Sequence, residues 1–404
     1  MTARGRGVLA LGVLCWVVAI VFGSPALYPV AAGLVLVVPL AVAWVRITLR
    51  QPYVSRRWRQ ENLLERDDVR IELVLEREPG LPLPNVFAHE HLGRLGEVEV
   101  ELTPHGRGRH SGSYRLRDVP RGRHRFGPVG LSIADPFGLA EAGLAVEEQQ
   151  ALVVYPRLVE LERLFFAGGA GPEHGRRLLL RRPVGFDLHS VRDYQQGESL
   201  RRVHWPSTAR RGSLMVKELE DSPRDEVAVL LDGDPAAVTG SPPDSSFDVA
   251  VRVAGSILLA QVRHGRRCVL VLNTAGRETQ AVSSEGPEWQ RALELLAAAE
   301  PDARRPAAAL LQSADGPAAR SLELVVVTSR VEQSLVNRLL ERAVTRRAVA
   351  LVHVEPESFA GRPRRPEPAL LRLQAAGVPI TVVRQGDELA DVLNGPRAAE
   401  AARA

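Results

Sequence analysis

The segment 191–212, VRDYQQGESLRRVHWPSTARRG, gathers within one short stretch residue types that could do chemistry. Asp193, His204 and Ser207 are the residue types of a nucleophilic triad. The tyrosine, the tryptophan and the arginines of the segment could instead stack on the bases and contact the phosphates of a nucleic acid. A third possibility is structural, because arginine pairs bidentately with carboxylates.

Two observations argue against catalysis in this segment. Pro206 directly precedes Ser207, and the chain has no G-x-S-x-G sequence of the kind that exposes a catalytic serine. The members of a triad are recognised by their geometry and roles rather than by one run of sequence, so three suitable types in a row indicate little. We therefore predict no catalytic residue.

The charge pattern argues against a nucleic-acid partner. The chain carries 52 Lys+Arg against 48 Asp+Glu, a net charge of +4, which is too small to indicate a polyanion partner. Acidic residues would also repel phosphates near the arginines of the segment, and these are Asp193, Glu198, Glu218, Glu220 and Asp221. Because these acids offer the arginines partners within the protein, we favour structural ion pairing. We predict no nucleic acid and no small-molecule substrate.

Asp232 and Asp234 form the second candidate site. They lie in the run DEVAVLLDGD at 225–234, whose apolar part is typical of a buried parallel strand. Carboxylates after such a strand can bind Mg²⁺, which prefers oxygen ligands, but aspartates also cap turns there. No G-x-G-x-x-G follows the strand and no G-x-x-x-x-G-K-[ST] occurs in the chain. We therefore predict neither a dinucleotide site nor a P-loop site.

Alternating strands and helices surround these aspartates. Apolar runs predict strands at 225–234, 266–273, 322–329, 348–355 and 378–385, and helical spacing predicts helices at 247–265, 288–300, 334–346, 368–377 and 387–394. This order predicts a mostly parallel sheet with helices on both faces, a Rossmann-like α/β domain. Ligands of such folds bind at the carboxyl ends of the strands, where Asp232 and Asp234 lie.

The region 60–160 has a different pattern. Period-two alternation, as in VRIELVLE at 69–76, recurs between turn residues, and this is typical of an antiparallel β-sandwich. Histidines in the region, among them His110 and His124, match no zinc spacing and are interpreted as solvated loop residues. Glycine and arginine interrupt any single period over 161–190, which we interpret as a linker.

The N-terminal region predicts membrane helices. No charged residue occurs between Arg6 and Arg46, a span far longer than the roughly 20 residues that one membrane helix needs. The segment GSPALYP at 23–29 interrupts this span with turn residues. We therefore predict a hairpin of two transmembrane helices, at about 8–22 and 30–45.

Arginines lie on both sides of this hairpin, and their distribution predicts its orientation. Arg4 and Arg6 precede the first helix and several arginines follow the second. The positive-inside rule then predicts a multi-pass protein of the cell membrane, with both termini and the bulk of the chain in the cytoplasm. The alternative is a cleaved signal peptide followed by one anchor, although Pro25 and Pro29 replace a clean cleavage site.

The segment 185–220, GFDLHSVRDYQQGESLRRVHWPSTARRGSLMVKELE, resembles the signature of the domain of unknown function 58 family. Members of this family typically read G-x-E-F-x-x-x-R-x-Y-x-x-G-D-x-x-R-x-I-D-W-x-x-x-A-R-x-x-x-L-x-V-K-x-x-E. The matching positions are Gly185, Arg192, Tyr194, Gly197, Trp205, Ala209, Arg210, Leu214, Val216, Lys217 and Glu220, and Arg202 directly follows the position of the arginine in G-D-x-x-R. The element DPFGL at 135–139 and the order of the parts also resemble the family.

The resemblance implies a von Willebrand factor A-like domain after the signature. The departures of the chain from the family include two positions of the signature and one metal motif. Glu198 and His204 stand where the family has aspartates. The run 232–236, DGDPA, lacks both serines of the Asp-x-Ser-x-Ser metal motif. Only Asp232 carries over, so we predict no cofactor, with Mg²⁺ at Asp232 and Asp234 as the alternative.

These observations together predict a multi-domain, membrane-anchored cytoplasmic adaptor or assembly factor rather than an enzyme. Its partners, a MoxR-type AAA+ ATPase and the clients of that ATPase, are implied by the resemblance. The predicted interaction residues are Arg192, Tyr194, Gly197, Arg202, Trp205, Arg210, Lys217 and Glu220. The predicted parts are two transmembrane helices in 1–50, a β-sandwich-like domain at 60–160, a linker at 161–190, the signature at 185–220 and the A-like α/β domain at 221–400. The alternative function is a metal-dependent hydrolase that uses Asp232 and Asp234 near the membrane.

Overall fold

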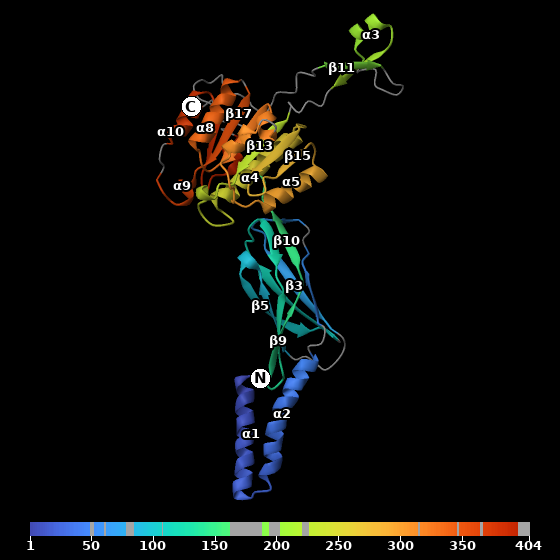
Figure 1. Cartoon of the computed structure of the whole chain (residues 1–404), viewed down its shortest axis with the longest axis vertical. Helices are drawn as coiled ribbons and strands as arrows, with labels where there is room; N and C mark the ends of the chain where they lie inside the picture. The colour runs from blue at the N-terminus through green and yellow to red at the C-terminus, as the bar shows by residue number, and fades with distance from the viewer. Residues whose placement is uncertain are drawn as a thin grey trace. The chain divides into compact units, whose positions relative to one another are not determined.

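The chain forms two compact units, Met1–Tyr155 and Pro156–Ala404, drawn in Figure 1. The computed structural model describes residues 1–48, 52–59, 62–77, 85–106, 108–161, 188–193, 203–219, 226–313, 316–345, 347–363 and 367–394. Most of the linker predicted at 161–190 therefore lies outside the described residues.

Two apolar helices begin the first unit, α1 (Ala3–Phe22) and α2 (Leu27–Thr48), and they lie side by side in Figure 1. Both are long and apolar enough to cross a membrane. Both extend beyond the predicted bounds: α1 includes Arg4 and Arg6, and α2 includes Arg46. The predicted turn at 23–29 is shorter than expected, because α2 begins at Leu27. Gly12 allows their close packing, since a Cβ there would lie 2.9 Å from Cγ2 of Val35.

The rest of the first unit is a β structure built from two sheets. The larger sheet is antiparallel throughout and has the order β1 (Tyr53–Arg57), β3 (Val69–Glu76), β6 (Arg109–Leu116), β5 (Glu97–Pro104), β4 (Asn85–His91), β8 (Val129–Ala134), β9 (Glu141–Val146). The smaller sheet has the order β2 (Leu63–Leu64), β10 (Gln150–Tyr155), β7 (Gly122–Phe126), with β10 parallel to β2 and antiparallel to β7. Alternate side chains of both sheets, such as Ile71, Leu131 and Leu152, meet in one core.

Two histidines of this unit correct the sequence interpretation. His110 and His124 lie on β6 and β7, and both are buried rather than solvated in loops. Nε2 of His124 lies 2.8 Å from the carbonyl oxygen of Pro120. The loop interpretation failed because the surrounding arginines and glycines concealed the period of two, which turns every second side chain inward.

A buried polar network crosses the core of the β structure. Nε of Arg56 donates to both carboxylate oxygens of Glu90 at 3.0 and 3.2 Å, and the hydroxyl of Tyr114 donates to Oε2 of Glu90 at 2.7 Å. The other guanidinium nitrogens of Arg56 donate to the carbonyl oxygens of Glu148 and Gly127, each at 2.7 Å. Burial and the neighbouring Glu90 raise the pKa of the Tyr114 hydroxyl. The network therefore ties β1, β4, β6 and two loops together.

The second unit contains a six-stranded sheet. Its order is β15 (Thr279–Val282), β14 (Cys268–Asn273), β13 (Val227–Asp232), β16 (Glu323–Thr328), β17 (Ala348–Val354), β18 (Ile380–Val383). All neighbours are parallel except the edge strand β15, which is antiparallel to β14. Every residue of β13 and β14 is buried, and this explains their unbroken apolar sequences.

Helices cover both faces of this sheet. On one face, Val229 and Leu231 pack with α4 (Ser246–Arg263), α5 (Pro287–Ala298), α9 (Pro356–Phe359) and α11 (Leu389–Asn394). On the other face, Ala228 and Leu230 pack with α6 (Ala308–Gln312), α7 (Pro317–Arg320), α8 (Gln333–Val344) and α10 (Pro368–Ala375). Crossover helices of this kind leave the carboxyl ends of the parallel strands at one edge of the sheet, where they can carry a site.

Candidate functional site

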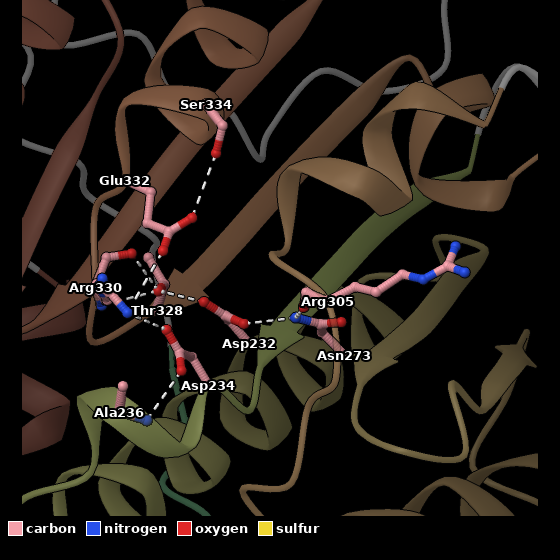
Figure 2. Close-up of polar contacts among 9 residues, drawn as sticks. All are labelled: Asp232, Asp234, Ala236, Asn273, Arg305, Thr328, Arg330, Glu332 and Ser334. Atoms are coloured by element: carbon pink, nitrogen blue, oxygen red, sulfur yellow. Dashed lines mark hydrogen bonds and ion pairs between the residues drawn. The ribbon is translucent and has the colours of Figure 1, made fainter.

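The carboxyl ends of three neighbouring strands bring together Asp232, Asn273 and Thr328, as Figure 2 shows. Each is the last residue of its strand, in β13, β14 and β16. Asp232 lies opposite Asn273 in the parallel register. Residues 41 and 96 positions apart in the chain therefore meet at one edge of the sheet.

Asp232 is the buried centre of this group. Its Oδ1 accepts a hydrogen bond of 2.7 Å from Nδ2 of Asn273, and its Oδ2 lies 2.8 Å from Oγ1 of Thr328. The residue is only 8% exposed. Burial raises the pKa of Asp232, as do the charges of Asp234 and Glu332, while the hydrogen bonds from Asn273 and Thr328 act in the opposite direction.

The contacts of Thr328 indicate where a proton lies in this group. Its Oγ1 accepts from the backbone N–H of Arg330 at 3.0 Å and lies 2.8 Å from both the carbonyl oxygen of Arg330 and Oδ2 of Asp232. A hydroxyl has one hydrogen, so it can donate one full hydrogen bond to only one of these oxygens at a time. When Asp232 carries a proton, it donates to Thr328, Thr328 donates to Arg330, and each contact is satisfied.

The amide of Asn273 completes the same pattern. Its Nδ2 carries two hydrogens, and it donates to Oδ1 of Asp232 and, at 3.1 Å, to the carbonyl oxygen of Arg305. The neutral form of Asp232 therefore fits the hydrogen-bond geometry on both of its oxygens.

Asp234 lies beside this group and is paired with the guanidinium of Arg330. Its Oδ1 accepts from the N–H of Ala236 at 2.9 Å, which caps the short helix η4 (Pro235–Ala237). Its Oδ2 accepts from Nη1 of Arg330 at 3.0 Å, and the same nitrogen lies 3.4 Å from Oε1 of Glu332 (Figure 2). The guanidinium thus supplies the positive charge that two neighbouring carboxylates require.

The two predicted metal ligands thus lie at the same edge of the sheet, but all four of their carboxylate oxygens already have partners from the protein. Within the described part of the chain, no three or more His, Cys, Asp or Glu side chains are grouped in a way that could hold a metal ion. The geometry fits a group of hydrogen-bonded side chains at the carboxyl ends of the strands, in which the guanidinium of Arg330 supplies the positive charge next to Asp234.

The signature segment forms a ribbon of its own. β11 (Leu188–Asp193) pairs antiparallel with β12 (Met215–Leu219), which places Arg192 opposite Val216 and Val191 opposite Lys217. The short helix α3 (Trp205–Arg211) lies between the two strands in the chain and ends at Gly212, whose φ is 70°. Of the predicted interaction residues, Tyr194, Gly197, Arg202 and Glu220 lie outside the described residues.

Two predicted interaction residues are placed on the surface of α3. Trp205, the first residue of the helix, is 65% exposed. Arg210 is exposed as well and lies in the last turn, beside Arg211. The buried side chains of Val203 and Met215 lie at the base of this helix. The helix therefore presents an indole and two guanidinium groups outward.

His204 and Ser207 contact each other at the start of α3. Nδ1 of His204 lies 2.8 Å from Oγ of Ser207, three residues later, and His204 is the N-cap of the helix. The backbone N–H of His204 donates to the carbonyl oxygen of Met215 at 2.8 Å, and the N–H of Met215 donates to Oγ1 of Thr208 at 3.0 Å. These contacts hold α3 on β12, which gives His204 a structural role. The side chain of Asp193 lies outside the described residues.

Sequence reasoning did not single out Asn273, Thr328 or Arg330. A usable signal was present, since Asn273 and Thr328 are the polar residues that end the predicted apolar runs at 266–273 and 322–329. The last polar residue of each predicted parallel strand is a candidate for the same edge as Asp232.

Comparison with known proteins gives a family match and one curated relative. Residues 190–360 match the model of a family described as "Protein of unknown function DUF58". The relative is the "Uncharacterized protein YeaD" of Bacillus subtilis (strain 168), which is 26% identical over 305 residues, covering 72% of this chain and 73% of the relative.

Solved structures resemble the chain weakly. The crystal structure of BslA, a bacterial hydrophobin, matches with 13% identity and a TM-score of 0.18, covering 26% of this chain and all of that one. Cwp6 from Clostridium difficile matches with 10% identity and a TM-score of 0.17, covering 82% of this chain and 45% of that one. Likenesses of this size carry no argument about fold or function.

Proposed function

We propose that this protein is a member of the domain of unknown function 58 family that acts as a membrane-anchored adaptor or assembly factor. In this proposal the helices α1 and α2 span the cell membrane, with both termini and both units in the cytoplasm. The sheet of the second unit is a von Willebrand factor A-like domain, and the partner is a MoxR-type AAA+ ATPase with its clients. The family match over 190–360 supports the membership of the family, and the two apolar helices support the membrane anchor.

The observation that carries the proposal is the exposed surface of α3. Trp205 is 65% exposed, although burial of an indole in an interface is strongly favourable. Tryptophan and arginine are the residues most enriched at the energetic centres of protein interfaces. Trp205 and Arg210 are also positions that match the family signature. A docking surface explains why these two residue types face solvent together.

The geometry at the carboxyl edge of the sheet gives less support to a metal-dependent hydrolase. Both oxygens of Asp232 and both oxygens of Asp234 have partners within the protein. A metal ion would have to displace Arg330 from Asp234 and replace the contacts of Asp232 with Asn273 and Thr328. The adaptor proposal requires neither change.

We expect Trp205→Ala to reduce recovery of the partner about tenfold, the loss that truncation of an interface anchor produces. The measurement is quantitative crosslinking of the full chain in native membranes, followed by capture and detection of the MoxR-type ATPase. Leu371→Ala on α10 is a matched control, because Leu371 is a large apolar residue with a similar exposure of 60%. Equal recovery with Trp205→Ala and Leu371→Ala would contradict the proposed docking surface.

The proposed topology has a separate test. The full chain with a reporter at its C-terminus is expected to fluoresce when the reporter is a cytoplasmic fluorescent protein and to stay inactive when it is alkaline phosphatase. The mass of the purified protein is expected to include residues 1–25, since both helices are retained. A mass that lacks the first helix would support the alternative of a cleaved signal peptide.

A further inference from the structure

The turn between β8 and β9 presents an aromatic side chain on a rigid support. This turn has the sequence DPFGL at 135–139, and Phe137 within it is 72% exposed. The buried carboxylate of Asp135 accepts from the N–H of Phe137 at 2.8 Å and from the N–H of Ala140 at 2.5 Å. Gly138 adopts a φ of 67°, which lets the chain reverse. These contacts hold the backbone of the turn, and the side chain of Phe137 lies exposed on it.

The same turn is bonded to the first turn of α1. The N–H of Thr2 donates to the carbonyl oxygen of Leu139 at 3.0 Å, and Oγ1 of Thr2 donates to the carbonyl oxygen of Gly138 at 2.6 Å. A Cβ on Gly5 would lie 2.1 Å from the carbonyl oxygen of Leu139, so only glycine allows this approach. The turn therefore lies where α1 enters its apolar span.

The other helix meets the β structure at the same end of the hairpin. Ala41 and Val45 of α2 are buried in one core with Leu139 and Ala140, which follow Phe137 in the chain. Arg46, one residue after Val45, is exposed in the last turn of α2. Both helices thus contact the turn region at the point where their apolar sequences end.

Basic side chains lie in the adjoining ends of α1 and α2. Arg4 lies beside the turn, with Nη1 3.7 Å from the position that a Cβ of Gly138 would take. Arg4, Arg6 and Arg46 are all exposed. Aromatic and basic side chains at the ends of membrane helices are the groups that favour the interface between water and lipid, where cations meet anionic headgroups.

We propose that Phe137 inserts into the interfacial region of the lipid bilayer beside the hairpin, with Arg4 and Arg46 at the level of the lipid phosphates. This inference rests on the proposed membrane anchoring by α1 and α2. The occupant of the exposed Phe137 surface is the lipid, because that surface is continuous with the ends of two helices of membrane-spanning length. Insertion gives the β structure a third point of attachment and restricts its tilt on the membrane.

A fluorescent probe at position 137 tests the inference in the full chain. In a Cys15→Ser, Cys268→Ala background, Phe137→Cys is labelled with an environment-sensitive nitrobenzoxadiazole group and reconstituted into vesicles of phosphatidylcholine and phosphatidylglycerol. We expect a blue-shifted emission that is quenched by lipids with a spin label near the headgroup. Val344→Cys is the matched control, because Val344 is 81% exposed on α8 of the second unit and its probe is expected to keep the emission of water.

Flotation of the same vesicles separates the two levels of the proposal. If the protein floats with the vesicles while the probe at position 137 keeps a water-like emission, the insertion of Phe137 is overturned and the anchoring by the helices stands. A blue shift without quenching by the spin-labelled lipid would show that protein covers Phe137, and this also overturns the inference. Protein that does not float overturns the anchoring and the insertion together.

Discussion

Arg56→Met is expected to destabilise the β structure of the first unit by about 3–5 kcal/mol, the cost of removing one partner of a buried ion pair. The side chains of Arg56 and Glu90 are 1% and 0% exposed, so water cannot solvate the carboxylate that the substitution leaves behind. The variant also removes the donors to the carbonyl oxygens of Glu148 and Gly127. Urea unfolding of the detergent-solubilised full chain, read out by pulse proteolysis of the first unit, measures the change.

The exposed pair Arg109–Glu76 offers a control for this prediction. Nη2 of Arg109 and Oε1 of Glu76 are also 3.0 Å apart, but the two side chains are 46% and 48% exposed. Arg109→Met is expected to cost no more than about 1 kcal/mol, because solvent screens such a pair. Adding Glu90→Gln to Arg56→Met is expected to recover part of the loss, since no unpaired charge then remains buried. Equal losses in Arg56→Met and Arg109→Met would contradict the importance of burial.

Asp232→Ala is expected to destabilise the second unit by about 2–3 kcal/mol, because it removes one hydrogen-bond partner from the buried amide of Asn273 and one from the hydroxyl of Thr328. Asp232→Asn is expected to be at least as stable as the wild type at neutral pH. Its carbonyl can accept from Asn273 and its amide can donate to Thr328, which reproduces the contacts of a protonated Asp232. Pulse proteolysis of the second unit compares the three proteins.

The raised pKa of Asp232 predicts how the stability of the second unit changes with pH. Because the folded protein holds the proton of Asp232 more tightly than the unfolded chain, where the pKa is near the ordinary 3.8, the stability contributed by this group is present at low pH. This contribution to stability decreases as the pH rises from the pKa of the unfolded chain through the higher pKa of the folded protein. Asp232→Asn lacks this group, so its stability relative to the wild type is expected to increase over the same interval.

Magnesium provides the contradicting outcome. If Mg²⁺ stabilises the wild type but not Asp232→Asn, the ionised carboxylate of Asp232 binds the metal. The interpretation of Asp232 as a protonated group is then wrong. That result would favour the metal-dependent hydrolase over the adaptor. Unchanged stability of both proteins with Mg²⁺ is expected from the pairing of Asp234 with Arg330.

The parallel strands of the second unit could be predicted from the sequence because burial on both faces leaves a simple pattern. Every residue of β13 is buried, and the run at 225–234 is apolar for the same reason. The helix predicted at 247–265 corresponds to α4, Ser246–Arg263, which begins with a capping box between Ser245 and Asp248. The edge strand β15 was missed, because its four residues are largely exposed and carry no apolar run.

The strand β1 was missed for a different reason. Its sequence YVSRR follows the apolar helix α2 and resembles the basic flank that the positive-inside rule describes. In the structure Arg56 faces inward to Glu90, which lies 34 positions later in the chain. A local pattern cannot show that an arginine has a buried partner at such a distance.

The candidate site was predictable only in part. The aspartates were found because they follow a recognisable strand, whereas their partners depend on the order of the strands in the sheet. β14 and β16 flank β13, and only this order brings Asn273 and Thr328 to opposite sides of Asp232. The pairing of Asp234 with Arg330 also requires a loop whose course the sequence pattern does not define.

The hydrogen bonds between Thr2 and the turn at 135–139 have a consequence for how the chain folds during synthesis. The residues they join are up to 137 positions apart, and a ribosome adds roughly 5–20 residues per second. The two helices can form early from local contacts, but the N–H and hydroxyl of Thr2 lack these acceptors until Leu139 has been made. For several seconds the nascent chain must carry an unfinished β structure next to the two apolar helices. Chaperones or translation pauses that act on this protein are therefore expected to act before residue 140 or so leaves the ribosome.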